Sequence, residues 1–453
     1  MDEAKALTIA GSDSSAGAGV QADLKTFSAL GVYGSTVLTC VTAQNTLGVY
    51  LVEPLEPRLV EMQYKAVLED PGFDAVKTGL LPSKPIVELV VRELKKLDKP
   101  IVVDPVYIAG TGFKLSSEEA YETLVRGLIP IATVVTPNAN EASKITGVKV
   151  ETVEDAEEAA RRISSLGVEL VVVKGGHLKG APVDVILHRG RLLKLRGTRV
   201  EGSFHGAGCC FSAAIAAMLA KGLKPLEAVK EAKRFIETAI AHHHKVGSGI
   251  KPVNPMARLY MEAEKWSIVE NVRQAIRLLE AEPKVSRLIP EVASNLVMAL
   301  SYARSPSEVV GIPGRIVKVL GGVKAVMEPA YGASRHVART VLTAMRFDPE
   351  VRAGMNIKMD ERILETCIRL GFKISGYDRR LEPPEVKARE GLSTSWGAEQ
   401  AIKAAGGAVP DVIYHRGDWG KEPMITVLGR DAIDVVHKVL KIVEALQREP
   451  FVE

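Results

Sequence analysis

Short apolar runs alternate with longer amphipathic segments from residue 6 to about residue 260. The runs are rich in β-branched residues and predict strands at 6–10, 35–42, 75–78, 101–103, 133–136 and 170–173. Between them, apolar residues recur at helical spacing with charged residues on the other side, which predicts helices that include 20–30, 84–97 and 151–166. This alternation predicts an α/β fold with a largely parallel sheet and helices on both faces.

A segment rich in glycine and proline, residues 247–255, interrupts this pattern. It predicts two domains, 1–260 and 261–453. The second half is predicted to start with helices at 267–281 and 289–300, followed by strands at 315–319 and 324–327 and a helix at 334–345. We therefore expect a second α/β domain.

Composition limits the class of protein. Of 453 residues, 46% are hydrophobic and 25% are charged, as in soluble globular proteins, and no apolar run reaches eighteen residues. No export signal is recognisable, so we expect a cytoplasmic protein without a membrane partner. The net charge of +4 and the lack of a basic tract argue against a nucleic-acid partner. Four cysteines without zinc-ligand spacing suit a reducing compartment: Cys40, Cys209, Cys210 and Cys367.

Two glycine-bearing segments, 11–19 and 206–212, each open a predicted helix. A helix N-terminus presents unpaired N–H groups and a positive dipole end, so each segment can hold a phosphate. The second also places Cys209 at the helix start, which points to a small-molecule kinase. Residues 17–22 match the dinucleotide fingerprint, but the loop is too long and the next strand ends without an acidic residue, which disfavours a nicotinamide cofactor.

Seven motifs together resemble those of the bifunctional hydroxymethylpyrimidine/phosphomethylpyrimidine kinases, which are ribokinase-like enzymes. They are residues 6–13, 17–34, 42–46, 102–106, 136–141, 174–178 and 205–209. The resemblance covers about residues 5–258 and implies ATP and Mg²⁺ as cofactors, pyrimidine substrates and a homodimer. One departure is Ala207, where that family usually has threonine, so a hydroxyl contact to phosphate is absent while the backbone cradle remains.

The resemblance also implies residue roles. Asp23 and Gln44 would hydrogen bond the aminopyrimidine, because a carboxylate and an amide can read its mixed donor and acceptor edge. Gly11, Ala18 and Val106 would complete the substrate site. The alternative for Asp23 is an ordinary first-turn acid that favours the helix dipole.

For the nucleotide, the resemblance implies that Asp104 and Glu141 hold Mg²⁺ directly or through water, as hard oxygen ligands should. Phosphate contacts would come from the following residues: Asn138, Lys174, Gly206, Ala207 and Gly208. Alternatively, Asn138 caps the next helix, Glu141 is a solvated first-turn acid and Lys174 is an ordinary solvated residue.

Cys209 would act on the substrate hydroxyl, and we expect the helix N-terminus to make its thiol more acidic. Phosphoryl transfer has a loose transition state, so a cysteine can suffice where a relative uses aspartate. The alternative is a small buried hydrophobe, which we prefer for Cys210. The run 242–244 of three histidines is interpreted as a helix surface, because adjacent helical residues point about 100° apart and do not share one metal ion easily.

In the second half, Arg335, His336 and Arg339 share one helix start, a positive face suited to phosphate or a merely solvated one. Segments within about 268–450 resemble the thiamine-phosphate synthase domain that archaea fuse behind the pyrimidine kinase. This resemblance implies condensation of hydroxymethylpyrimidine diphosphate with hydroxyethylthiazole phosphate. Arg315 would neutralise the departing diphosphate and His336 would hydrogen bond or protonate it. Asn295 and Lys421 are further candidates.

Two alternatives remain open at this point. The second domain also occurs as a ligand sensor, so it could bind thiamine phosphate without catalysis and restrain the kinase. The first half could be a pyridoxal or sugar kinase of the same superfamily. Gln44 and Cys209 argue against a sugar, because the sugar kinases favour carboxylates around hydroxyls and an aspartate base.

Overall fold

The computed structural model describes residues 3–110, 112–176, 182–197, 199–387, 392–418 and 421–447. The chain divides into two compact units, residues 1–259 and 260–453, so the division lies one residue from the predicted boundary. Each unit has its own sheet and its own hydrophobic core. The predicted helix at 267–281 is part of α9 (Ala257–Glu280), which begins ten residues earlier than expected.

The first unit is built on a nine-stranded sheet with the order β3-β2-β1-β4-β5-β6-β7-β8-β9. The six strands from β2 to β7 in this order are parallel, and β3, β8 and β9 pair antiparallel at the edges. The strands are β1 (Lys5–Asp13), β2 (Tyr33–Gln44), β3 (Val49–Pro54), β4 (Ala75–Thr78), β5 (Ile101–Val103), β6 (Val134–Val135), β7 (Leu170–Val173), β8 (Val183–His188) and β9 (Arg191–Arg196). The predicted strands of this half are therefore all present.

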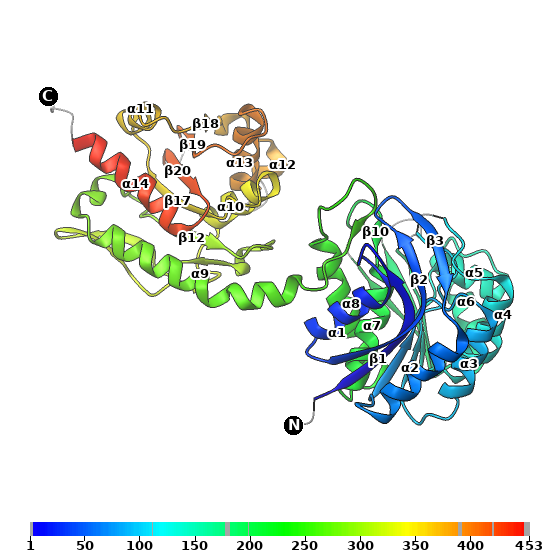
Figure 1. Ribbon diagram of the computed structural model, residues 1–453. Helices are drawn as coiled ribbons and strands as arrows, with labels where there is room; N and C mark the ends of the chain where they lie inside the picture. The colour runs from blue at the N-terminus through cyan, green and yellow to red at the C-terminus, as the bar shows by residue number, and fades with distance from the viewer. Residues whose placement is uncertain are drawn as a thin grey trace. The chain divides into compact units, whose positions relative to one another are not determined.

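Helices cover both faces of this sheet (Figure 1). One face packs against α1 (Gly19–Ala29), α7 (Ala207–Ala220) and α8 (Pro225–Ala241). The other packs against α2 (Pro57–Glu69), α3 (Lys84–Leu94), α4 (Glu118–Gly127), α5 (Ala139–Thr146) and α6 (Val153–Ser164). The central strands read as continuous apolar runs because both faces are buried.

Polar residues stand where the parallel strands end. Gln44 ends β2, Asp13 ends β1, and Asp104 follows β5, with Asn138 and Lys174 just beyond β6 and β7. The carboxyl ends of parallel strands meet at one edge of a sheet, which is where open α/β folds bind ligands. A short parallel pair, β10 (Phe204–His205) with β11 (Lys251–Pro252), holds the segment before α7 at this edge.

The second unit contains a seven-stranded sheet with the order β16-β13-β12-β17-β20-β19-β18. All neighbours pair antiparallel except β18 and β19. The strands are β12 (Leu296–Ala299), β13 (Val309–Gly311), β16 (Ala330–Tyr331), β17 (Ala353–Lys358), β18 (Ile374–Gly376), β19 (Val412–His415) and β20 (Met424–Gly429), and a separate hairpin joins β14 (Ile316–Val319) to β15 (Gly322–Ala325).

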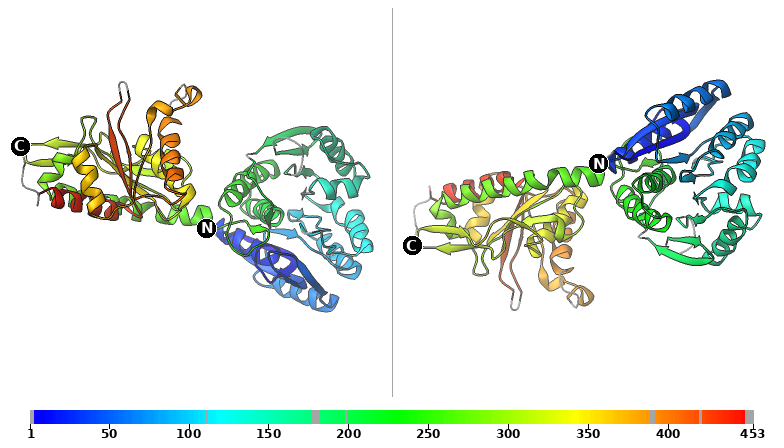
Figure 2. Two further views of the ribbon diagram at one scale, coloured as in Figure 1. Left: turned by 90° about the horizontal axis from the view of Figure 1, so that it is seen from above. Right: turned by 90° about the horizontal axis from the view of Figure 1, so that it is seen from below.

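Figure 2 shows this second sheet between two helical layers. One core forms with α9, α11 (Glu361–Arg369) and α14 (Ala432–Gln447), and the other with α10 (His336–Phe347) and α13 (Leu392–Ala404). A short helix, α12 (Pro384–Lys387), precedes α13. The predicted second α/β domain is thus present, although its sheet is mostly antiparallel.

Two local predictions are wrong. The segment 289–300 is not a helix, because its apolar residues form β12, whose four positions are buried on both faces of the sheet and so lack the alternation that marks a half-exposed strand. The three histidines do not lie on a helix surface, since α8 ends at Ala241. In the described parts of the chain, no group of three or more His, Cys, Asp or Glu side chains could hold a metal ion.

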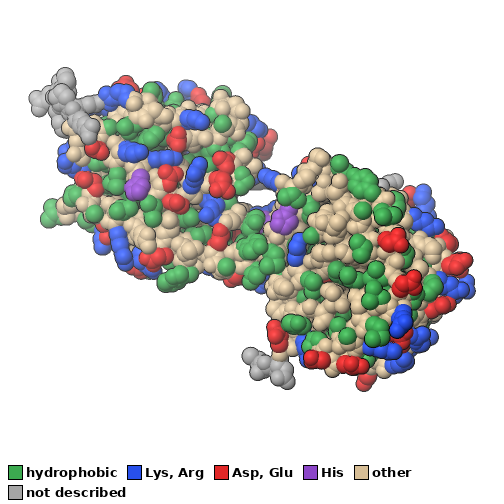
Figure 3. Space-filling view, viewed as in Figure 1, with side chains coloured by type: hydrophobic (Ala, Val, Ile, Leu, Met, Phe, Trp, Pro, Cys, Tyr) green, Lys and Arg blue, Asp and Glu red, His purple; other side chains and the backbone are tan. Residues whose placement is uncertain are grey.

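The surfaces carry both signs of charge, and Figure 3 shows Lys and Arg side chains interspersed with Asp and Glu over each unit. Within the described residues, we find no helix with the length and apolar character needed to cross a membrane.

Candidate active sites

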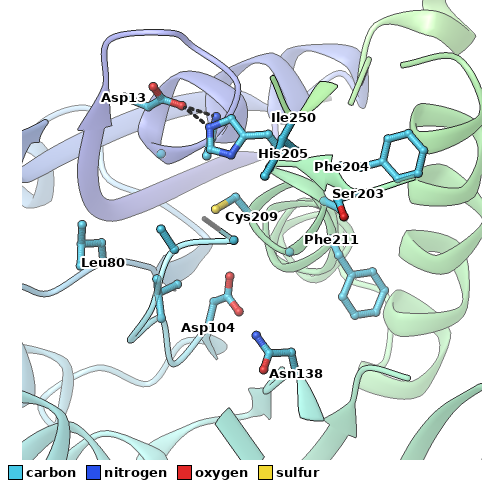
Figure 4. Close-up of a pocket in the computed structure, with 18 of the residues that line it drawn as sticks. Asp13, Leu80, Asp104, Asn138, Ser203, Phe204, His205, Cys209, Phe211 and Ile250 are labelled. Atoms are coloured by element: carbon cyan, nitrogen blue, oxygen red, sulfur yellow. Dashed lines mark hydrogen bonds and ion pairs between the residues drawn. The ribbon is translucent and has the colours of Figure 1, made fainter. Parts of the chain in front are cut away.

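The first unit contains a cavity of about 400 Å³ at the carboxyl ends of its parallel strands. Its lining comes from segments between Ala10 and Ile250 (Figure 4). Twelve of the thirteen residues predicted for this unit line the cavity: Gly11, Ala18, Gln44, Asp104, Val106, Asn138, Glu141, Lys174, Gly206, Ala207, Gly208 and Cys209. The structure therefore brings together residues that are nearly 200 positions apart in the sequence.

Opposite charges meet on one side of the cavity. Lys174 Nζ lies 3.0 Å from Asp104 Oδ1, which also accepts a hydrogen bond from the Thr136 hydroxyl at 3.2 Å. Asp104 is 2% exposed, and the Lys174 side chain is 18% exposed. Lys174 is thus held with its ammonium inside the site, and the alternative of an ordinary solvated lysine is wrong.

Asn138 and Glu141 form a capping box at the start of α5. The Asn138 side chain accepts the backbone N–H of Glu141 at 2.9 Å, and Glu141 Oε2 accepts that of Asn138 at 2.7 Å. The capping alternative is therefore correct for Asn138, but Glu141 is only 7% exposed and is not a solvated acid. Burial raises the pKa of Glu141 to about 7, and the charge of Asp104 adds to this while Lys174 opposes it.

The start of α7 contains the predicted phosphate cradle, residues 206–209. Gly206 has φ +80°, a left-handed conformation that favours glycine, and it caps α7 without a side-chain hydrogen bond. A Cβ on Gly208 would lie 3.1 Å from Lys174 Nζ and 3.7 Å from Asp104 Oδ2. The unpaired N–H groups of the helix start therefore face the same space as the Lys174 ammonium.

Cys209 lines the cavity, but the expectation of an acidified thiol is wrong. Burial raises the pKa of Cys209 to about 11, with the charge of Lys77 and a backbone hydrogen bond from Gly19 opposing the shift. The desolvation of a thiolate outweighs the Lys77 charge and the Gly19 hydrogen bond here. The thiol is protonated near neutral pH. Cys210 is fully buried, as predicted.

Asp23 is the one predicted residue of this unit that does not line the cavity. Its carboxylate is fully buried and accepts hydrogen bonds from Lys77 Nζ at 2.7 Å and Thr8 Oγ1 at 2.6 Å. Burial lowers the pKa of Lys77, but the nearby negative charges, that of Asp23 first, together with the hydrogen bond to Asp23 raise the pKa above its usual value, so Lys77 stays protonated. A direct contact between Asp23 and the pyrimidine stays a prediction, while the structure shows Asp23 holding Lys77.

The lining residues that sequence reasoning missed include Asp13, Lys77 and His205. Lys77 could have been found, because a lysine inside the buried strand β4 requires a carboxylate partner. Asp13 and His205 lie within the motifs that carry the resemblance, but their pairing joins residues 192 positions apart and no local pattern reveals it.

In the second unit, cations gather around His336, the first residue of α10. Burial lowers the pKa of His336, and the charges of Arg339, Arg315, Lys421 and Arg379 lower it further. The structure thus brings together four of the six predicted residues of this unit. Arg379 had not been predicted as a site residue.

A turn before β14 presents Arg315. Arg315 has φ +72°, unusual for a residue with a side chain, and its guanidinium hydrogen bonds the carbonyl of Val292. Asn295 is 6% exposed and clamps this turn, since its Oδ1 accepts the N–H of Ile312 and its Nδ2 donates to the Ile312 carbonyl, both at 2.9 Å. Direct ligand contacts by Asn295 and by Arg335, the exposed residue before α10, stay predictions.

Aromatic side chains lie near this cluster. The Tyr377 ring is 5.2 Å from that of His415 and 6.1 Å from that of Trp396, centroid to centroid. Burial lowers the pKa of His415 to about 4 and raises that of Tyr377 to about 12, so both are neutral, and the Arg379 charge acts on each of them. Cations beside planar rings suit a ligand with phosphate groups and a heterocycle.

Comparison with known proteins identifies both units. The Phosphomethylpyrimidine kinase family matches residues 13–254, and the family of the thiamine-phosphate synthase ThiN matches residues 271–441. The "Bifunctional thiamine biosynthesis protein ThiDN" of Methanocaldococcus jannaschii is 37% identical over 439 residues, which cover 96% of this chain and 97% of that protein. The chain belongs to this bifunctional family. The predicted fusion of a pyrimidine kinase domain to a thiamine-phosphate synthase domain is confirmed.

The kinase unit alone also has close relatives. The hydroxymethylpyrimidine/phosphomethylpyrimidine kinase of Streptomyces coelicolor is 43% identical over 249 residues, covering 55% of this chain and 93% of that protein. The structure of Bacillus subtilis pyridoxal kinase in complex with ADP aligns with a TM-score of 0.54 and 39% identity, over 57% of this chain and 99% of that one. The predicted ribokinase-like fold of the kinase unit is confirmed.

Proposed function

We propose that the kinase unit transfers the γ-phosphoryl group of ATP to hydroxymethylpyrimidine and then to the resulting monophosphate. The synthase unit then condenses the diphosphate with hydroxyethylthiazole phosphate, giving thiamine phosphate and pyrophosphate. The observation that carries this proposal is the match to one bifunctional relative along 96% of the chain. The kinase cavity, with Lys174, Asp104 and Cys209 on one wall, supports it.

In the kinase reaction, the N–H groups of the phosphate cradle and the Lys174 ammonium hold the transferred phosphoryl group. The substrate oxygen forms a bond to the γ-phosphorus, the bond to the oxygen between the β- and γ-phosphorus atoms breaks, and ADP leaves. Because the transition state is loose, the attacking hydroxyl loses its proton late, to an oxygen of the transferred phosphoryl group, and no strong base is needed. Cys209, kept as a thiol by burial, orients the hydroxyl rather than removing its proton.

Mg²⁺ fits the carboxylates of Asp104 and Glu141. Two buried carboxylates lie near one lysine. Burial raises the pKa of Glu141 and the charge of Asp104 adds to this, so a divalent cation between them would favour the ionised form of Glu141. Mg²⁺ usually takes one or two protein carboxylates together with phosphate oxygens and water, so a larger cluster is not required. When bound, the ion would neutralise charge on the nucleotide phosphates.

The pyrimidine is proposed to bind at the opposite side of the cavity. Gln44 offers a side-chain amide, and Gly11, Ala18 and Val106 offer close backbone approach. Asp23 supports this site through Lys77. An amide can pair with both the amino group and a ring nitrogen of an aminopyrimidine.

In the synthase unit, Arg315, Arg339 and Lys421 are proposed to hold the diphosphate. The bond between the pyrimidine methylene carbon and the diphosphate oxygen breaks, pyrophosphate leaves, and the thiazole nitrogen bonds that carbon. Burial and four nearby cations lower the pKa of His336 in the free protein, and a bound diphosphate would raise it again by opposing those cations. His336 is then suited to donate a hydrogen bond or proton to the leaving group.

A one-pot assay tests this assignment. The purified chain is supplied with hydroxymethylpyrimidine, hydroxyethylthiazole phosphate, ATP and Mg²⁺, and products are separated by mass spectrometry. Thiamine phosphate is the expected product. Pyrimidine phosphates that accumulate without thiamine phosphate would contradict the synthase assignment and support a sensor domain instead.

A second candidate for the kinase unit is pyridoxal phosphorylation, since a structural relative with 39% identity is a pyridoxal kinase. A competition assay separates the two. We expect hydroxymethylpyrimidine to be phosphorylated in preference to pyridoxal when both compete for limiting ATP, and the reverse preference would favour the second candidate.

The family resemblance also leads us to propose a homodimer. Light scattering of the intact chain should give twice the chain mass of 48.8 kDa. A mass of one chain would contradict this proposal without affecting the enzymatic one.

A further inference from the structure

Two loops from distant parts of the chain meet at the kinase cavity. The substrate loop, residues 11–19, runs from the last three residues of β1 to the first residue of α1, and the phosphate cradle, residues 206–209, follows β10. Both line the cavity, as does the pair of residues that joins them, Asp13 and His205. The kinase mechanism described above assigns no role to this pair.

The Asp13 carboxylate organises the substrate loop. Its Oδ1 accepts hydrogen bonds from the backbone and the hydroxyl of Ser15, each at 2.8 Å. Its Oδ2 accepts the N–H groups of Gly17 at 3.1 Å and Ala18 at 2.7 Å. Asp13 is 1% exposed. Burial alone would raise its pKa, but hydrogen bonds from His205, Ser15 and Ala18 hold the pKa of Asp13 well below its usual range, so it stays ionised.

One further donor to this carboxylate comes from the other loop. His205 Nε2 lies 2.9 Å from Asp13 Oδ2, and the two side chains are drawn with this contact in Figure 4. His205 is itself anchored, because β10 pairs with β11 and the His205 carbonyl accepts the N–H of Val253 at 3.1 Å. The next residue is Gly206, the first of the phosphate cradle.

The backbones of the two loops also interlock. A Cβ on Gly17 would collide with the His205 ring, and a Cβ on Gly206 would collide with the Gly17 carbonyl oxygen. Glycine is required at both positions for this close approach. The Asp13–His205 contact thus lies beside a close approach of the two loop backbones.

Phosphoryl transfer requires the substrate loop and the phosphate cradle to be held in a fixed position relative to each other. The acceptor pyrimidine and the transferred phosphoryl group rest on different loops, and reaction requires their reacting atoms to approach to about 3–3.5 Å. Folding brings the loops into contact, but a misplacement of about 1 Å is enough to lower the rate by about a hundredfold. A contact that fixes one loop on the other therefore acts on the rate and leaves each ligand's own contacts in place.

We propose that Asp13 and His205 form a clamp that positions the substrate loop against the phosphate cradle for phosphoryl transfer. Both are positioning residues, and neither needs to touch a reacting atom. The proposal rests on the kinase activity proposed above. If the wild-type protein shows no kinase activity, the proposed function is wrong. If the wild-type protein is active, the variants compared with it test the clamp alone.

The test compares three substitutions in the intact chain. His205→Ala removes the clamp, and His205→Gln restores an amide N–H that can reach Asp13. His188→Gln is the matched control, because His188 Nε2 lies 3.6 Å from Glu169 Oε1, its side chain is 17% exposed against 23% for His205, and it does not line the cavity. Calorimetry gives the number of ATP-binding sites per chain, and kcat is divided by this number so that only folded protein is counted. If His205→Ala binds no ATP, His205→Asn, whose amide is too short to reach, replaces it.

We expect His205→Ala to lower kcat by about 10- to 100-fold, with KM for ATP and for the pyrimidine within about twofold of wild type. His205→Gln should recover most of the loss, and His188→Gln should match wild type. Unchanged kcat in His205→Ala would overturn the clamp. A raised KM with unchanged kcat would also overturn it, since His205 would then be an ordinary binding contact.

Discussion

The buried ion pair below the kinase cavity gives a sharp test of the structure. In Lys77→Met, a side chain of similar length removes the ammonium and leaves the Asp23 carboxylate without its charged partner in a fully buried site. Breaking such a pair from one side costs about 3–5 kcal/mol, because the remaining charge stays desolvated. For a unit of this size, this corresponds to a fall in Tm of roughly 6–20 °C.

Scanning calorimetry measures this effect, and the chain supplies an internal reference. All three tryptophans, Trp266, Trp396 and Trp419, lie in the second unit, so tryptophan fluorescence identifies the unfolding of that unit separately. Only the kinase transition should move.

Two further variants make the test specific. Asp23→Asn with Lys77→Met removes both charges and should recover at least about 2 kcal/mol relative to Lys77→Met alone. Lys65→Met breaks the surface pair with Glu61, whose N–O distance is 2.8 Å, and should leave the Tm of the kinase transition nearly unchanged, because solvent screens this pair. Equal effects of Lys77→Met and Lys65→Met, or strict additivity in the double variant, would refute the reasoning.

Three other predictions concern the sites. Iodoacetamide should label Cys209 slowly at pH 7 and about tenfold faster per pH unit up to about pH 11, because a pKa of about 11 leaves little thiolate below that pH. Peptide mass spectrometry measures the labelling rate, and a rate that stops rising near pH 8 would contradict this prediction. His336→Ala should lower thiamine phosphate formation from supplied pyrimidine diphosphate by at least about tenfold while kinase turnover stays within twofold, and Cys209→Ala should do the opposite; parallel losses in both assays would reject independent sites. Omitting Mg²⁺ should abolish kinase turnover, and in Glu141→Gln the Mg²⁺ concentration for half-maximal rate should rise several-fold, whereas unchanged Mg²⁺ dependence would argue against Glu141 as a ligand.

Most of the kinase fold and cavity could be predicted from the sequence because its signals are local. Strands such as β7 are continuous apolar runs, Asp104 and Lys174 each follow a strand directly, and Asn138 lies three residues beyond the end of β6. Once the strands are parallel, those positions must meet at one edge. The pKa of Cys209 could not be predicted in this way, because it depends on how deeply the complete fold buries the thiol.

Long-range pairings were beyond the reach of the sequence. Asp13 meets His205, and Lys77 meets Asp23, only through the order of strands and helices in space. In the synthase unit, Arg379 acts on His336 from a distant segment for the same reason. The error at β12 has another cause, because a strand buried on both faces and a buried helix have equally apolar sequences.

The residues that line the kinase cavity are spread along almost the whole first unit, and this affects when the unit can bind nucleotide while the protein is being synthesised. The cavity takes its walls from residues as early as Ala10 and as late as Ile250. Since domains fold as units while the ribosome still adds residues, nucleotide cannot stabilise a nascent kinase unit until almost all of it has left the exit tunnel. Translation of the following unit then gives the completed kinase time to fill its site before the chain is released.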